Sequence, residues 1–225
     1  MKDINWSWVA GFFQAEGTPT GSHPRWKIQF YQHDLESMQL LQAFFVAELK
    51  DHHSAIYTET FTSKTFPNGK TYNWPKGKLS CRLNINGKYA YPIIKNIFPL
   101  LRGSKRTQTE VWAAKAKLEL PQLLAPLDFD FVIGFWEGDG SPTLDSYSQH
   151  IDFDFTQKDA EVLLDIRDLL NTGALMQSAN TNALRVYSTQ ERIDLWLSNI
   201  RLPWRHQQLE STIARLEALR GERTL

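Results

Sequence analysis

Residues 9–17 read VAGFFQAEG, and residues 132–140 read VIGFWEGDG. The two stretches share a glycine at the third position, a phenylalanine at the fourth and a glycine at the ninth. An acidic residue, Glu16 in one copy and Asp139 in the other, stands directly before the last glycine. Such a partial match between two stretches of nine residues in one chain is the first sign of an internal repeat.

The similarity extends beyond these nine residues. IQFYQHD at 28–34 and FDFTQKD at 153–159 share the pattern Phe-x-Gln-x-Asp, and NIFP at 96–99 resembles NIRLP at 199–203. All three pairs occur in the same order, and the partners in each are separated by a little over 100 residues. The sequence therefore predicts a duplicated domain.

The predicted duplication divides the chain into a first half at 1–118, a linker at 119–127 and a second half at 128–225. Two prolines, at 121 and 126, interrupt any helix in the linker. In each half the residue patterns read roughly α-β-β-α-β-β-α. We therefore expect an α+β fold with two tandem repeats.

The strands are predicted from alternation. In RWKIQF at 25–30 and HIDFDF at 150–155, apolar and polar residues alternate, so each strand has one apolar and one polar face. A second hairpin follows in each half, with turns expected near 67–69 and 180–182. Each sheet should thus cover helices with one face and leave a polar face for another partner.

The two repeated stretches are predicted to be buried helices, because they are apolar nearly all round. Small residues lie four apart in each: Gly11 and Ala15 in the first, Gly134 and Gly138 in the second. Side chains of this size let two helix backbones approach closely. We expect the two helices to pack against each other through these faces.

Composition narrows the class of protein. The chain has 225 residues and is 42% hydrophobic, and its single cysteine, Cys81, excludes a disulfide framework and a cysteine-based zinc site. No apolar run is long enough to span a membrane, and the first residues do not resemble a signal peptide. We expect an intracellular protein that is not secreted and has no membrane partner.

The formal net charge of zero hides an asymmetry between the halves. Residues 1–118 hold 16 Lys and Arg against 8 Asp and Glu, whereas residues 119–225 hold 9 against 17. The net charges are therefore +8 and −8. The first half is basic enough to follow a phosphate backbone; alternatively, the two halves only attract each other.

The two acids of the repeats occupy an unfavourable place. Glu16 and Asp139 fall in the last turn of their predicted helices, where the helix dipole is already negative. If the helices pack side by side, the acids end close together and repel unless a cation lies between them. Carboxylates and the free carbonyls of the last turn are ligands for hard divalent metals, and paired metals can assist phosphodiester cleavage.

VAGFFQAEG and VIGFWEGDG resemble the LAGLIDADG motif of homing endonucleases, in the form that carries two motifs in one chain. The resemblance covers the order of elements along nearly the whole chain. It implies a monomer with internal pseudo-two-fold symmetry, whose antiparallel sheets form a saddle on double-stranded DNA. It also implies Mg²⁺-dependent cutting of both strands of a long, non-palindromic site, with Mn²⁺ as a substitute and Ca²⁺ as a non-cleaving one.

The resemblance assigns roles residue by residue. Glu16 and Asp139 match the metal-binding acids, and Ala15 and Gly138 match positions whose carbonyls contribute to metal binding. Lys88, after RLNING, resembles a lysine found near the scissile phosphate. In the second half, RVYSTQE at 185–191 offers no lysine, so equal cutting of the two strands does not follow.

Two glutamines of the repeated pattern, Gln32 and Gln157, resemble a residue that orders active-site water. The alternative is that each only bonds a turn at the end of its strand. We count them among the candidate catalytic residues with Glu16, Asp139 and Lys88.

The resemblance places the polar strand faces in the major groove, where base edges differ from one another. Any one of these side chains can also be an ordinary solvated strand residue. The candidates for DNA binding are Arg25, Lys27, Gln29, Lys78, Ser80, Arg82 and Asn84 in the first half, and His150, Asp152, Asp154, Gln177, Arg185 and Tyr187 in the second.

Three functions fit these features. The first is a site-specific DNA endonuclease, in a compartment that contains DNA (an organelle or a prokaryotic cytoplasm). The second is an intron-splicing maturase of the same fold, which binds RNA without cutting DNA, and the third is a DNA-binding regulator. Acids retained in both motifs favour the endonuclease, because a maturase does not need them.

Overall fold

The computed structural model describes residues 2–21, 25–50, 54–65, 69–177 and 181–222. The turns expected near 67–69 and 180–182 lie partly outside these ranges. The elements of the first half are α1 (Trp6–Glu16), β1 (Gly17–Thr20), β2 (Lys27–Gln32), α2 (Leu35–Leu49), β3 (Ser54–Thr65), β4 (Thr71–Asn86), η1 (Gly87–Tyr89), α3 (Ala90–Ile97), η2 (Phe98–Leu100) and α4 (Gly103–Ala116). Those of the second half are α5 (Phe129–Asp139), β5 (Gly140–Asp145), β6 (His150–Gln157), α6 (Ala160–Leu170), β7 (Ala174–Gln177), β8 (Asn182–Tyr187), α7 (Gln190–Asn199) and α8 (Pro203–Glu222).

The two halves build sheets of the same topology. The strand orders are β1-β2-β4-β3 and β5-β6-β8-β7, and every neighbouring pair is antiparallel. The glycine that ends each motif starts the first strand and faces a phenylalanine: Gly17 pairs with Phe30, and Gly140 with Phe155. The predicted α+β fold with a repeated arrangement of helices and strands is confirmed.

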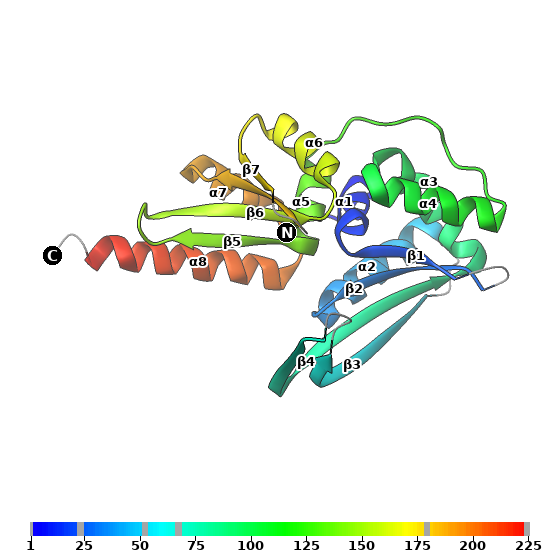
Figure 1. Ribbon diagram of the computed structural model, residues 1–225, viewed down its shortest axis with the longest axis horizontal. Helices are drawn as coiled ribbons and strands as arrows, with labels where there is room; N and C mark the ends of the chain where they lie inside the picture. The colour runs from blue at the N-terminus through cyan, green and yellow to red at the C-terminus, as the bar shows by residue number, and fades with distance from the viewer. Residues whose placement is uncertain (1, 22–24, 51–53, 66–68, 178–180, 223–225) are drawn as a thin grey trace.

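Helices α1 and α5 form the centre of the molecule and lie side by side between the two sheets (Figure 1). Their backbones touch at matching glycines. A methyl group on Gly11 would overlap the carbonyl oxygen of Phe131, and one on Gly134 would overlap that of Trp8. The predicted contact through small residues is therefore present, and it holds the two halves in one body.

The strand alternation is confirmed on the inner faces. Ile28, Phe30, Ile151, Phe153 and Phe155 are all fully buried against the helices. Aromatic rings dominate this core because pairs such as Phe153 and Trp196, stacked 4.4 Å apart, fill the layer between sheet and helix.

The halves differ in two respects from the expected pattern. Each closes with two helices, α3 and α4 or α7 and α8, where one was predicted. The second hairpin is also unequal: β3 and β4 contain 12 and 16 residues, whereas β7 and β8 contain 4 and 6. Among the described residues, no helix is long and apolar enough to cross a membrane.

Candidate active site

The two motif acids stand at the ends of helices that begin in the same way. Asn5 accepts a hydrogen bond from Trp8 N and Asp128 one from Phe131 N, so both helices have a side-chain cap at the start. Each then runs for 11 residues and ends on its acid. The sequence thus sets the length of each helix and delivers the acid to the last position before a strand.

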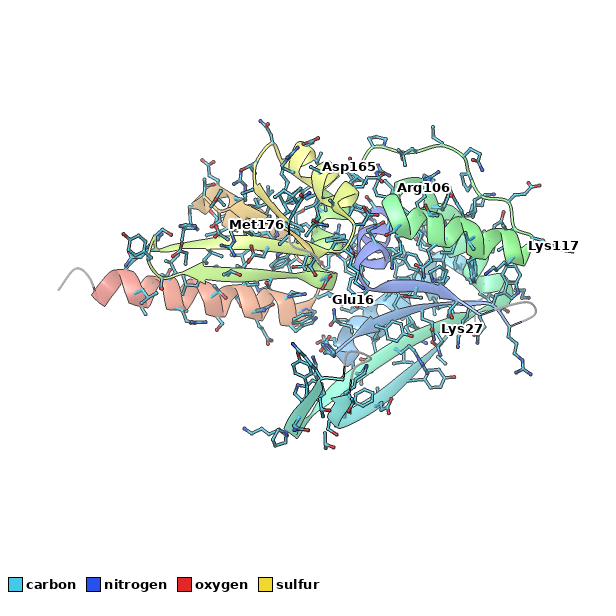
Figure 2. All side chains as sticks on the ribbon, in the orientation of Figure 1. Glu16, Lys27, Arg106, Lys117, Asp165 and Met176 are labelled. Carbon is cyan, nitrogen blue, oxygen red and sulfur yellow. The ribbon has the colours of Figure 1, made fainter. Side chains whose placement is uncertain are left out.

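Packing of α1 on α5 brings the two acids together. A Cβ on Gly138 would lie 2.6 Å from Ala15 Cβ and 3.3 Å from Glu16 Cγ, so the last turns of the two helices are in contact. Figure 2 shows Glu16 in the middle of the molecule, where the halves meet. The acid pair is therefore shared between the halves.

The surroundings of the acids disfavour negative charge. Burial, together with the charge of Asp139, raises the pKa of Glu16 to about 7, although Arg205 and Lys105 oppose part of the rise. Burial likewise raises the pKa of Asp139 to about 6, against the opposing effect of the same two cations. The side chain of Asp139 is the more exposed of the two. Both carboxylates would gain from a bound cation.

Two basic residues flank the pair. Lys105 Nζ donates to the carbonyl of Gly17, and Arg205 donates to the carbonyls of Glu137 (2.9 Å) and Gly138 (3.1 Å). Burial lowers the pKa of Lys105 to about 8 and that of Arg205 to about 10, although the acids oppose both shifts. Neither residue was among the sequence-derived candidates.

Lys88 follows the end of β4 that lies away from Gly17. It belongs to η1, two residues beyond Asn86, and Asn86 pairs with Lys27 at the end of the sheet away from Gly17. Its ammonium group lies 4.9 Å from the centre of the Tyr89 ring. The cations that act on both acids are therefore Lys105 and Arg205 rather than Lys88. One feature of the sequence could have indicated them: Lys105 lies shortly after the matched segment NIFP, and Arg205 shortly after NIRLP.

The two repeated glutamines end β2 and β6. Gln32 Oε1 accepts from the His33 backbone (2.8 Å), and Gln157 Oε1 accepts from the Lys158 backbone (2.9 Å), as the turn-bonding alternative requires. Gln32 Nε2, however, is buried and has no hydrogen-bond partner among the described residues. That amide group therefore keeps unused N–H donors.

The donors around the acids suit a hard divalent cation. No cluster of three or more His, Cys, Asp and Glu side chains occurs among the described residues, so the protein offers two carboxylates and backbone carbonyls. Mg²⁺ is commonly held by one or two carboxylates together with substrate phosphates. The carbonyl of Gly138, expected to be free, already accepts a hydrogen bond from Arg205.

In the first sheet the candidate DNA-binding residues share the face turned away from the helices. Gln29 pairs with Asn84 in register and donates to its side chain at 2.7 Å. Arg82 pairs with Tyr57, whose ring centre is 5.3 Å from the guanidinium. The register puts Lys27, Gln29, Lys78, Ser80, Arg82 and Asn84 on this face, and Arg25 lies just before β2.

In the second sheet the candidates bind one another. Arg185 Nε lies 2.9 Å from Asp154 and 3.8 Å from Asp152, and His150 Nε2 lies 3.0 Å from Asp152. Burial raises the pKa of Asp152, which is only 2% exposed. The expectation that Asp152 is open to base edges is therefore not met. Tyr187 is 51% exposed, and Gln177 is exposed at the end of β7.

Solved structures with the same fold include DNA-cutting enzymes. The LAGLIDADG meganuclease I-AabMI bound to uncleaved DNA is similar over 97% of this chain and 93% of its own, with a TM-score of 0.63 and 16% identity. The LAGLIDADG homing endonuclease I-GzeII in complex with its DNA target is similar over 99% and 93%, with a TM-score of 0.62 and 13% identity. The sequence itself matches no family model and no curated protein. The chain thus has the fold of LAGLIDADG homing endonucleases.

Proposed function

We propose that this protein is a site-specific endonuclease that cuts double-stranded DNA with the help of Mg²⁺. The observation that carries the proposal is the joint site at the ends of α1 and α5, where Glu16 and Asp139 meet and Lys105 and Arg205 flank them. The fold supports it, because I-AabMI and I-GzeII are bound to DNA in their structures. The retained acids favour this reading over a maturase that binds RNA.

The chemistry is hydrolysis of a phosphodiester. A water molecule loses a proton as its oxygen bonds to phosphorus, one P–O ester bond breaks, and the leaving oxygen takes up a proton. A divalent metal would be held by Glu16 and Asp139, with the carbonyl of Ala15 and the remaining lone pair of the Gly138 carbonyl as further oxygen donors. When bound, it would supply Lewis-acid activation and charge neutralisation.

The residues of the chain supply positioning and charge. Lys105 and Arg205 flank the acids, and in this proposal they stabilise the negative charge that accumulates on the attacked phosphate. Gln32, with its amide nitrogen buried and without a partner among the described residues, orients the water. The outer sheet faces place the molecule on its site through the major groove.

The proposal includes a setting and a set of partners. The protein acts as a monomer in a compartment that contains DNA. Mn²⁺ substitutes for Mg²⁺ in cleavage, and Ca²⁺ supports binding without cleavage.

The test is selection of cleaved duplexes from a randomised library with Mg²⁺, followed by single-turnover cleavage of the selected site. Glu16→Gln and Asp139→Asn should each slow cleavage by about 10²–10³-fold while DNA binding persists. Glu217→Gln, an exposed acid on α8, serves as the matched control and should cleave normally. Binding by the unchanged chain without any cleavage would contradict the proposal, and preferred binding of intron RNA would support the maturase.

A further inference from the structure

The long hairpin of β3 and β4 has no equivalent in the described part of the second half. It occupies residues 54–86, and its outer end projects from the body of the molecule (Figure 1). The register between the strands shifts after Phe61, and pairing resumes at Ser63 and Asn73. The outer part therefore has no counterpart among β7 and β8, and most of its described residues are exposed.

Aromatic side chains gather on one face of this outer part. Phe61 pairs with Lys78 in register, and Trp74 lies with its ring centre 5.4 Å from Lys78 Nζ. Tyr72 stacks on Trp74 with ring centres 6.2 Å apart and is 51% exposed. This is the same face that carries Ser80 and Arg82 nearer the sheet centre. These rings take no part in the buried core.

Two adjacent hollows follow from this arrangement. One, of about 270 Å³, is lined by Phe61 and Trp74 together with Lys64 and Lys78. The other, of about 220 Å³, lies nearer the body of the molecule and is lined by Tyr31, Tyr57, Phe61 and Arg82. Each hollow thus combines an apolar ring with a cation. Among the described residues of the hairpin, the one acid is Glu59, which pairs in register with Ser80 and lines the second hollow beside Arg82.

This combination matches the edge of a particular base. In the major groove most groups on the base edges are hydrogen-bond donors or acceptors, and the apolar one is the 5-methyl group of thymine. Aromatic rings cannot satisfy donors or acceptors, but they gain from covering a methyl group. Cations beside the rings suit the phosphates on either side of the base.

We propose that the outer β3–β4 hairpin reads thymines: Phe61 and Trp74 contact 5-methyl groups in the major groove, and Lys64 and Lys78 contact the neighbouring phosphates. The inference rests on the proposed binding of double-stranded DNA, but not on its cleavage. The first half would therefore recognise an outer segment of the DNA site that contains thymines. The described part of the second half has no equivalent hairpin for such a segment.

The experiment measures binding alone, so that it does not depend on activity. Duplexes from a randomised library are selected with the full chain in Ca²⁺, and the selection is repeated with the Phe61→Ala, Trp74→Ala double variant. Positions whose base preference disappears in the double variant mark the segment that the hairpin reads. We expect thymine to be preferred there by the unchanged chain.

Deoxyuridine, which lacks only the methyl group, then replaces thymine at those positions. Binding by the unchanged chain should weaken roughly four-fold per thymine, the factor for one buried methyl group. The double variant should bind both duplexes equally. Thr60→Ala, next to Phe61 but on the opposite face, is the matched control and should behave like the unchanged chain.

Three results would overturn the inference: no thymine preference at the marked positions, no loss with deoxyuridine, or the same loss in the double variant. A chain that binds and shows these thymine effects but never cuts in Mg²⁺ would contradict the endonuclease and leave the inference supported. If no duplex is bound at all, both proposals fail. Thermal unfolding of the variants should match the unchanged chain, because the rings lie outside the core.

Discussion

Lys105 and Arg205 occupy matching positions in the two halves. Each is the third residue of a closing helix, α4 or α8, and each donates to a backbone carbonyl next to a motif acid, at Gly17 or Gly138. The position is the same in both halves, but the first half has a lysine there and the second an arginine. The two halves of the candidate site are therefore equivalent in place but not in chemistry.

The first prediction concerns these cations. Lys105→Met should slow cleavage of the selected duplex by about 10²-fold or more, because in the proposed mechanism the lost charge stabilises the attacked phosphate. Lys88→Met is the control and should stay within about three-fold of the unchanged chain, a factor that corresponds to less than about 1 kcal/mol. Single-turnover cleavage measures both, and a larger loss in Lys88→Met would return the role to that lysine.

A second prediction follows from the positions of the two cations, one beside each motif acid. Lys105→Met should slow mainly one strand and Arg205→Met mainly the other, since each cation serves the half of the site nearest to it. Supercoiled plasmid carrying the selected site should then accumulate as nicked circles with either variant. Strand-specific end labelling checks the assignment; equal slowing of both strands by both variants would show that the cations act jointly.

The third prediction is a pH dependence of the metal-free protein. The folded pKa of Glu16, about 7, lies above its ordinary value of 4.5, so the folded state favours the protonated form. This penalty is absent below about pH 4.5 and complete above about pH 7, and stability therefore falls as pH rises through that window. Because Glu16 is only half-buried, solvent screening should limit the loss to roughly 1 kcal/mol.

Denaturant unfolding at pH 5 and pH 8, with and without Mg²⁺, measures this loss. Mg²⁺ should restore stability at pH 8 and have little effect at pH 5, where protons compete for the carboxylates. Glu16→Gln should weaken the pH dependence of stability and remove most of the stabilisation by Mg²⁺. Stability that rises from pH 5 to pH 8 in the metal-free chain, and does so equally in Glu16→Gln, would contradict the pKa argument.

The fourth prediction tests the central helix pair. Gly11→Ala should destabilise the protein by at least about 2 kcal/mol, because the added methyl group meets the backbone of α5, which cannot yield as a side chain would. Gly221→Ala, near the end of α8 and open to space, is the matched control. It should be neutral or slightly stabilising, since alanine favours helix over glycine. Denaturant midpoints compare the two.

The fifth prediction concerns the unequal charges of the halves. Arg82→Gln should lower the salt dependence of DNA binding by about one phosphate contact. Arg185→Gln should change it little, because Asp154 at 2.9 Å already neutralises that guanidinium. Binding titrations across salt concentrations give the two slopes, and equal changes would show that Arg185 leaves Asp154 to contact a phosphate.

The sequence by itself determined the repeated architecture and the acid pair. The nine-residue repeat carries its own helix length, its small-residue face and its acid at the last turn, and these are local properties that follow from residue type and spacing. Alternation in β2 and β6 likewise fixed the buried faces, because the period of two is a property of the strand alone. Glu16 and Asp139 therefore stand out from residue type and position along the chain.

Tertiary structure decided which cations, and which open polar groups, belong to the site. Lys105 and Arg205 reach the acids only because α4 and α8 pack back toward the centre, and that distance does not follow from their spacing in the sequence. Lys88 fitted a local pattern, but it follows the end of β4 that pairs with Lys27, away from Gly17. Asp152 and Arg185 also looked exposed as single strand residues. Register across β6 and β8 pairs Arg185 with Asp154 and leaves Asp152 3.8 Å from the same guanidinium, and carboxylates beside a guanidinium bind it rather than solvent.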